Sequence, residues 1–133
     1  MATDVVRTAS AVTVSIAHDP ALVRTVRLVA AAVARRSSHD EEFIEEVRLA
    51  VGEACALMIG SGSPDDEPVT VRLAVDARLR VEVSAQGAVT APQRSIGDPE
   101  GIDPWALLRA LVGDFELGFD GARTTLTMSW LVP

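Results

Sequence analysis

The chain has 133 residues, of which 48% are hydrophobic and 23% charged, and this indicates one globular domain rather than a disordered chain. Its formal net charge of −7 argues against direct nucleic-acid binding, because phosphate contacts need a basic surface. No apolar run reaches the roughly 20 residues of a membrane span, and the first residues lack the layout of a signal peptide, so a cytoplasmic protein is expected.

A flexible tail over residues 1–10 and a single domain over residues 11–133 are expected. Alternating apolar residues predict a strand over residues 11–16. Asp19 is expected to cap a helix with Pro20 at its first position. Apolar residues at helical spacing predict the core face of that helix: Leu22, Val26, Val29 and Val33.

A second helix is expected to follow, with either Ser38 or Asp40 as its cap, and to run to about residue 60. Its core positions are predicted from the helical period: Phe43, Val47, Ala50, Val51, Ala54 and Met58. Cys55, the only cysteine, is expected to be a buried small hydrophobe rather than a nucleophile. His18, at the start of the first helix, is expected to be exposed.

The second half of the chain alternates strands with one helix. Apolar residues in every second position predict a hairpin over residues 69–75 and 79–84 with one solvated face. A helix over residues 103–112 and strands over residues 114–119 and 123–132 are expected to follow. The order β-α-α-β-β-α-β-β predicts an α+β two-layer sandwich, with the helices on one face of the sheet.

This order and the segment EVRLAVGEAC resemble the anti-sigma-factor serine kinase branch of the histidine-kinase-like ATPases, which have the Bergerat-type fold. The segment is similar to the family's signature for the second helix, R-L-A-V-x-E-A-C-T-N, and LLRALVGDFEL is similar to its stretch in the third helix. The resemblance covers residues 12–132. It implies that Glu53 matches a base that acts on the hydroxyl of a protein substrate. Leu57 stands where the family has an asparagine that binds Mg²⁺, four residues later on the same face.

Most of the other nucleotide-binding positions are also changed. The resemblance implies a D-x-G-x-G motif after the third strand, where Ala85 replaces the adenine-binding Asp, Gly87 is kept and Val89 replaces the last Gly. The family's two glycines ahead of the third helix fall at Ile102 and Pro104. The chain contains no asparagine or lysine, so neither residue type can bind Mg²⁺ or clamp a phosphate from another position.

These replacements predict that ATP binding and phosphoryl transfer are lost. A charged hydrogen bond from the adenine ring to a carboxylate is worth about 1.5–3 kcal/mol, and this chain has lost that carboxylate at Ala85. The loss of the Mg²⁺ ligand is more serious, because phosphoryl transfer depends on positioning and charge stabilisation. Glu53 is therefore interpreted as a relic, and no enzyme activity, nucleotide cofactor or metal ion is expected.

The resemblance implies a regulator: an anti-sigma factor, or an anti-sigma-like adaptor, that binds a sigma factor, an anti-anti-sigma protein of the STAS type, or both. Homodimers are common in that family, so a second copy is a further candidate partner. Two alternatives stay open. Glu53 and Gly87 favour an active serine kinase of an anti-anti-sigma factor with a rearranged ATP site. The more apolar pocket favours a small-ligand sensor.

The predicted partner surface lies on the first helix. Arg24, Arg27 and Arg35 fall within about 80° of one another around it, opposite the apolar face. A solvated face is the simpler interpretation of such a stripe. In an acidic protein, however, a basic stripe can orient an acidic partner, and the resemblance implies that the first helix contributes to sigma-factor binding. We therefore expect these arginines to bind the sigma factor.

Overall fold

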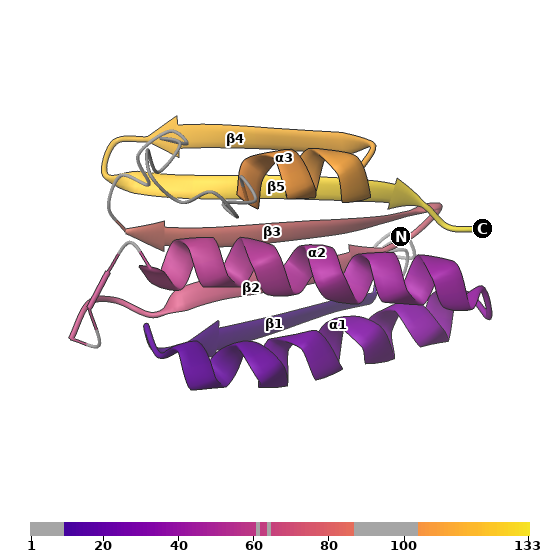
Figure 1. Cartoon of the computed structure of the whole chain (residues 1–133), viewed down its shortest axis with the longest axis horizontal. Helices are drawn as coiled ribbons and strands as arrows, with labels where there is room; N and C mark the ends of the chain where they lie inside the picture. The colour runs from indigo at the N-terminus through magenta and orange to yellow at the C-terminus, as the bar shows by residue number, and fades with distance from the viewer. Residues whose placement is uncertain (1–9, 61, 64, 87–103) are drawn as a thin grey trace, which may run out of the picture.

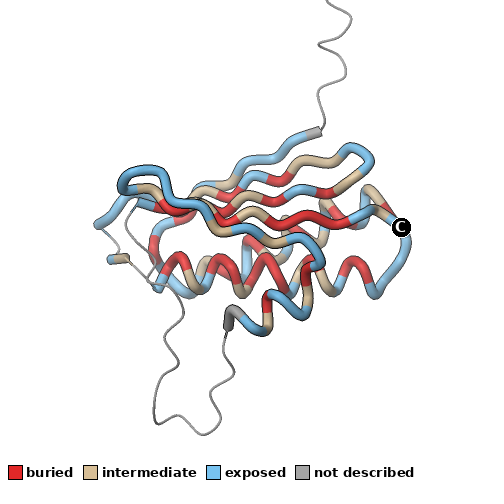
Figure 2. Tube along the Cα trace, turned by 90° about the horizontal axis from the view of Figure 1, so that it is seen from above, coloured by how far each residue is buried: buried red, intermediate tan, exposed pale blue. Residues whose placement is uncertain are grey.

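The computed structural model describes residues 10–60, 62–63, 65–86 and 104–133. These residues form one antiparallel sheet in the order β1-β2-β3-β5-β4, with α1, α2 and α3 on one face (Figures 1 and 2). The predicted α+β two-layer sandwich is confirmed. The elements are β1 (Ser10–Ile16), a 3-10 turn (Pro20–Leu22), α1 (Val23–Ser37), α2 (Glu41–Gly60), β2 (Val69–Val75), β3 (Arg78–Gln86), α3 (Pro104–Leu111), β4 (Asp114–Asp120) and β5 (Arg123–Leu131).

The core lies between the sheet and the helices, as the buried segments in Figure 2 show. Every second residue of the central strands β2, β3 and β5 faces it, as predicted: Val69, Val71, Leu73, Leu79, Val81, Val83, Leu126, Met128 and Trp130 are buried. The opposite face of the sheet carries polar side chains such as Arg72 and Arg80, which are exposed. This arrangement follows from the period of two along a strand.

Local capping signals define the starts of the first two helical segments. The side chain of Asp19 accepts a hydrogen bond of 3.0 Å from the Ala21 N–H, as predicted for a cap, although the first turn is 3-10 and α1 itself begins at Val23. Of the two candidate caps of α2, Asp40 receives the N–H groups of Glu42 and Phe43, at 3.0 and 3.2 Å. Ser38 instead accepts the N–H of Asp40.

The predicted core face of α1 is partly wrong. Val26 is fully buried, but Leu22, Val29 and Val33 are half-buried. The other buried positions are Val23, Ala30 and Ala34. The physical reason is that α1 packs against α2 as well as the sheet, and small alanines allow the two helices to approach closely.

One further expectation is corrected by the fold, and one is not tested. Ser10 belongs to β1, and residues 1–9 of the expected tail lie outside the described part. His18 is buried rather than exposed. Its Nδ1 lies 3.2 Å from the carbonyl oxygen of Ile59 and its Nε2 lies 3.0 Å from that of Glu67, so the ring connects the end of α2 to the segment before β2. Within the described ranges, no helix is long and apolar enough to cross a membrane.

Candidate functional site

Glu53 and Leu57 lie on the same side of α2, as their spacing predicts. Both side chains are half-buried, and Leu57 packs against the hydrophobic core. Within the described part of the chain, no hydrogen bond or ion pair orients the carboxylate of Glu53. A general base acts on a proton within hydrogen-bond reach, and the residue one turn from Glu53 is the aliphatic Leu57.

Ala85 lies near the end of β3, where its side chain is fully buried in the core. Its partner on β5 is Thr124, whose partner on β4 is Phe119. The fold therefore places Ala85 and Leu57 in the same core, and neither offers an atom that could bind adenine or Mg²⁺.

Thr124 is a polar residue that we did not select from the sequence. It is buried, with 1% of its surface exposed. It has the same phase along β5 as Leu126, Met128 and Trp130, so the alternation of that strand could have identified a hydroxyl on the core face beside Ala85.

The remaining nucleotide-binding positions are not placed. Gly87, Val89 and Ile102 lie outside the described residues. Pro104 is the first residue of α3, and nothing is described of its side chain. For the described residues, no group of three or more His, Cys, Asp or Glu side chains could hold a metal ion.

On the side of α2 that faces α1, a charged side chain of α1 packs against the helix. The Arg27 side chain crosses Gly52, where a Cβ atom would overlap Arg27 Nε and lie 3.0 Å from its Cδ and Cγ. Arg27 Nε is buried, and no described group accepts its hydrogen. Burial raises the pKa of the neighbouring Cys55 thiol to about 12, although the charge of Arg27 acts in the opposite direction. Cys55 is therefore an inert core residue, as predicted.

The three predicted arginines of α1 are not equivalent. Arg24 is exposed, whereas Arg27 is half-buried against α2 and so is only partly open to solvent. Arg35 is exposed but forms an ion pair of 2.9 Å with Glu41 at the start of α2. Leu28 lies one turn after Arg24, and 65% of its surface is exposed. Arg24, Arg27 and Leu28 together are called the α1 surface below.

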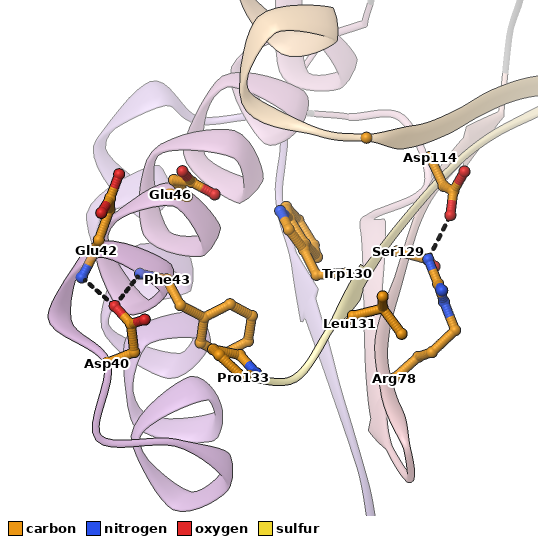
Figure 3. A pocket seen from close by; sticks show the side chains of 11 residues that line it. Asp40, Glu42, Phe43, Glu46, Arg78, Asp114, Ser129, Trp130, Leu131 and Pro133 are labelled. Atoms are coloured by element: carbon orange, nitrogen blue, oxygen red, sulfur yellow. Dashed lines mark hydrogen bonds and ion pairs between the residues drawn. The ribbon is translucent and has the colours of Figure 1, made fainter.

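A hollow lies beside the first turns of α2 (Figure 3), and Glu53 is not among its lining residues. Its volume is about 460 Å³, and Phe43 and Trp130 form part of its wall. Arg78, on the opposite wall, donates hydrogen bonds to Asp114 and Ser129. These polar groups bond to one another and Asp40 caps α2, so Glu42 and Glu46 are the other acidic side chains of the lining. It includes none of the predicted site residues.

Comparison with known proteins agrees with the fold. Residues 16–130 match the histidine kinase-like ATPase domain. No curated protein sequence matches the chain.

Two solved structures show the same fold. One contains the RsbU and RsbW domains of Rv1364c from Mycobacterium tuberculosis, with a TM-score of 0.68, 20% identity and coverage of 90% of this chain and 31% of that one. The other is the histidine kinase domain of the EL346 blue-light activated histidine kinase from Erythrobacter litoralis, with a TM-score of 0.54, 17% identity and coverage of 85% and 60%. The chain thus spans about a third and three fifths of these two proteins. From the matched residues and the fold, this chain belongs to the histidine kinase-like ATPase domain family.

Proposed function

We propose that this protein is an anti-sigma factor or anti-sigma-like adaptor that has kept the ATPase fold as a binding scaffold and lost phosphoryl transfer. One observation carries the proposal. Two described positions of this chain correspond to nucleotide-binding residues of the family, and both are apolar here. Leu57 is half-buried against the core, and Ala85 is fully buried in it. Binding and catalysis use different residues of one scaffold, so one can be lost while the other persists.

The first experiment tests the loss of kinase activity. The protein is incubated with labelled ATP, Mg²⁺ and a STAS-domain anti-anti-sigma protein, and isothermal titration measures nucleotide binding separately. We expect no labelled phosphate on the STAS protein, because Leu57 cannot bind the metal ion. Transfer that is abolished by Glu53→Gln would contradict the proposal and favour the alternative of an active serine kinase with a rearranged site.

The partner surface of this proposal is the α1 surface. The protein is acidic, with a net charge of −7, so a basic group stands out against its surroundings and can orient an acidic partner. Arg24 is exposed, and the guanidinium of Arg27 is held by its passage over Gly52. Arginine forms bidentate contacts with carboxylates, and the exposed Leu28 adds apolar area beside it. Sigma and anti-anti-sigma proteins are the partner classes that the family resemblance suggests.

The second experiment tests this surface. Arg24→Glu combined with Arg27→Glu should weaken sigma-factor binding at low salt. Because Arg27 is half-buried over Gly52, the melting temperature of the double variant is compared with that of Arg24→Glu alone. The matched control is Arg72→Glu combined with Arg80→Glu, which makes the same change of charge on the exposed face of the sheet. Equal losses in both double variants would indicate a general charge effect, and unaltered affinity in the α1 variant would place the docking site elsewhere.

A further inference from the structure

The hollow beside the first turns of α2, called the α2 hollow below, has no part in the proposed function. Its lining comes from α2 and its cap, the starts of β3 and β4, and the end of β5 (Figure 3). Its volume of about 460 Å³ falls within the range of about 300–1,000 Å³ that is typical of ligand pockets, so it can hold a few side chains of a partner. None of its described lining residues belongs to the α1 surface.

Part of the wall of the α2 hollow is apolar. Phe43 and Trp130 lie there, each with only 6% of its surface exposed. The indole N–H of Trp130 donates to the carbonyl oxygen of Leu111 at 3.4 Å, so this ring has no donor left for the hollow. At the rim, Leu131 is the most exposed of the large apolar side chains that the structure describes, with 70% of its surface accessible. An aliphatic side chain from a partner would cover this apolar area and remove it from water.

The acidic part of the lining lies on α2. Glu41 and Glu45, which do not line the hollow, form ion pairs with arginines of α1 and of α2 itself. Glu42 and Glu46 line the hollow, and no ion pair among the described residues engages them. These two glutamates are one turn apart on one face of the helix, where like charges destabilise it. A cation between them would replace this repulsion with two attractive contacts.

The opposite wall does not supply that cation. Arg78 is the one basic residue of the described lining, and its guanidinium donates hydrogen bonds to Asp114 and Ser129 (Figure 3). Asp40 is also engaged, because its side chain accepts two N–H groups of the first turn of α2. The described lining therefore keeps a negative charge that its own groups do not neutralise. The net charge of −7 further attracts a basic partner at long range.

We propose that the α2 hollow is a docking site for a basic segment of a partner protein. An arginine or lysine of the segment lies between Glu42 and Glu46, and a neighbouring aliphatic side chain packs against Leu131 and Trp130. One short segment can make both contacts, since a long basic side chain buries its stem along apolar surface and keeps its charge at the edge. This site is independent of the proposed function, because the α1 surface is basic and suits an acidic partner, whereas the α2 hollow has the opposite charge.

The first test measures the binding of fluorescein-labelled peptides by fluorescence anisotropy at low salt. The probe is LRLRLR, and the controls are GRGRGR, which lacks the aliphatic side chains, and LELELE, which has the opposite charge. We expect LRLRLR to bind, GRGRGR to bind about tenfold more weakly or worse, and LELELE not to bind. The NMR signals of the Leu131 methyl groups and the Trp130 indole should shift during the titration with LRLRLR.

Paired variants of α2 locate the site. Glu42→Gln combined with Glu46→Gln should weaken the binding of LRLRLR about tenfold or more, because both carboxylates are lost. The matched control is Glu41→Gln combined with Glu45→Gln, which removes the same charge from the same helix outside the hollow and should leave the affinity nearly unchanged. Leu131→Ser should weaken the binding of LRLRLR and leave that of GRGRGR nearly unchanged, since Leu131 is exposed and contacts only the aliphatic part of the peptide.

Equal losses in the two double variants would show a general charge effect and overturn the proposal, as would the absence of LRLRLR binding up to millimolar concentration. Equal affinities for LRLRLR and GRGRGR would also contradict it, because the apolar wall would then have no role. Self-association without peptide binding, lost in the Glu42→Gln and Glu46→Gln variant, would identify a second copy as the occupant instead. Each of these failures leaves the α1 surface unaffected, since that surface is tested with a sigma factor and with variants of α1.

Discussion

The two sides of α2 differ in the kind of contact that they make. Toward α1, the helix has a glycine beneath an arginine: Gly52 gives the space that the Arg27 side chain occupies, with Nε buried. Toward the end of β3, it presents Glu53 and Leu57, one acid with no described partner and one aliphatic residue that continues the core.

The two sides therefore differ in whether a polar side chain is held in a fixed position. A charged side chain held against a helix backbone has a defined position, which is useful to a binding surface. An aliphatic residue in place of a metal ligand contributes to folding but cannot bind an ion. The contact with α1 therefore contrasts with the side that carries Glu53 and Leu57, and each prediction below tests one of these two sides.

The largest effect is expected from the restoration of the family's acid at Ala85. Ala85→Asp introduces a carboxylate at a fully buried position, with no described cation nearby to compensate it. Such a charge costs about 3–5 kcal/mol, a large part of the stability of a domain of this size. Urea unfolding measures the loss. Gln86→Asp is the control, since Gln86 is the next residue on β3 and is exposed.

A near-normal free energy of unfolding in Ala85→Asp, together with micromolar ATP binding, would show that the site is one residue away from function. The contrast between the two sides of α2 would then be much weaker than proposed.

The second effect concerns alkaline pH and the side of α2 that faces α1. Burial raises the pKa of Cys55 from 9.0 to about 12, so the folded state holds the thiol proton more tightly than the unfolded state. Stability is therefore retained below pH 9 and falls by about 1.4 kcal/mol per pH unit as the pH rises toward 12. The chain has no lysine or tyrosine, so no other side chain titrates ordinarily in that range.

Urea unfolding at pH 8, 9, 10 and 11 measures this slope. Cys55→Ala should abolish it while it lowers the stability at neutral pH by the cost of a small cavity. An equal alkaline slope in Cys55→Ala would mean that another group is responsible and that the thiol is not sealed between the helices.

The sequence predicted the fold well because its signals are local. Alternation defined the strands, and Asp19 and the pair of candidate caps before α2 marked where the helices begin. The core face of α1 was less predictable. A scale of hydrophobicity favours Val29 and Val33, but Ala30 and Ala34 are the fully buried positions. That contact depends on a partner helix, which the period of a single segment does not reveal.

The candidate site was predictable only in part. The spacing of Glu53 and Leu57 was enough to place them on one side of α2. The burial of His18 was not predictable, because the carbonyl groups that face its ring belong to Ile59 and Glu67, which are 41 and 49 residues away. The contact of the Arg27 side chain with Gly52 is likewise long-range in sequence. Helical angles alone placed this arginine on the open face.

An intermediate effect is expected for Leu57→Asn, which restores the residue type of the family's metal ligand. Leu57 is half-buried and packs against the core, so the loss of its methyl groups should cost about 1–3 kcal/mol. Nucleotide affinity should remain poor, because Ala85 is unchanged. Ala56→Asn is the control, since it adds the same side chain at an exposed neighbour. Micromolar ATP binding by Leu57→Asn alone would contradict the apolar interpretation of this side.

The smallest effect on stability is expected for Gly52→Ala, which fills the space that the Arg27 side chain occupies. The new Cβ displaces the Arg27 side chain toward water, where its Nε can be hydrated. Alanine also favours a helix over glycine by about 1 kcal/mol, so the free energy of unfolding should stay constant or rise by up to that amount. Gly60→Ala is the control, because a Cβ at Gly60 meets no atom within 4 Å.

If the fixed guanidinium belongs to the partner surface, sigma-factor affinity should fall in Gly52→Ala as far as in Arg27→Ala and stay unchanged in Gly60→Ala. A stable Gly52→Ala variant with full affinity would show instead that Arg27 only fills space between the two helices, and the partner surface would then be reduced to Arg24 and Leu28.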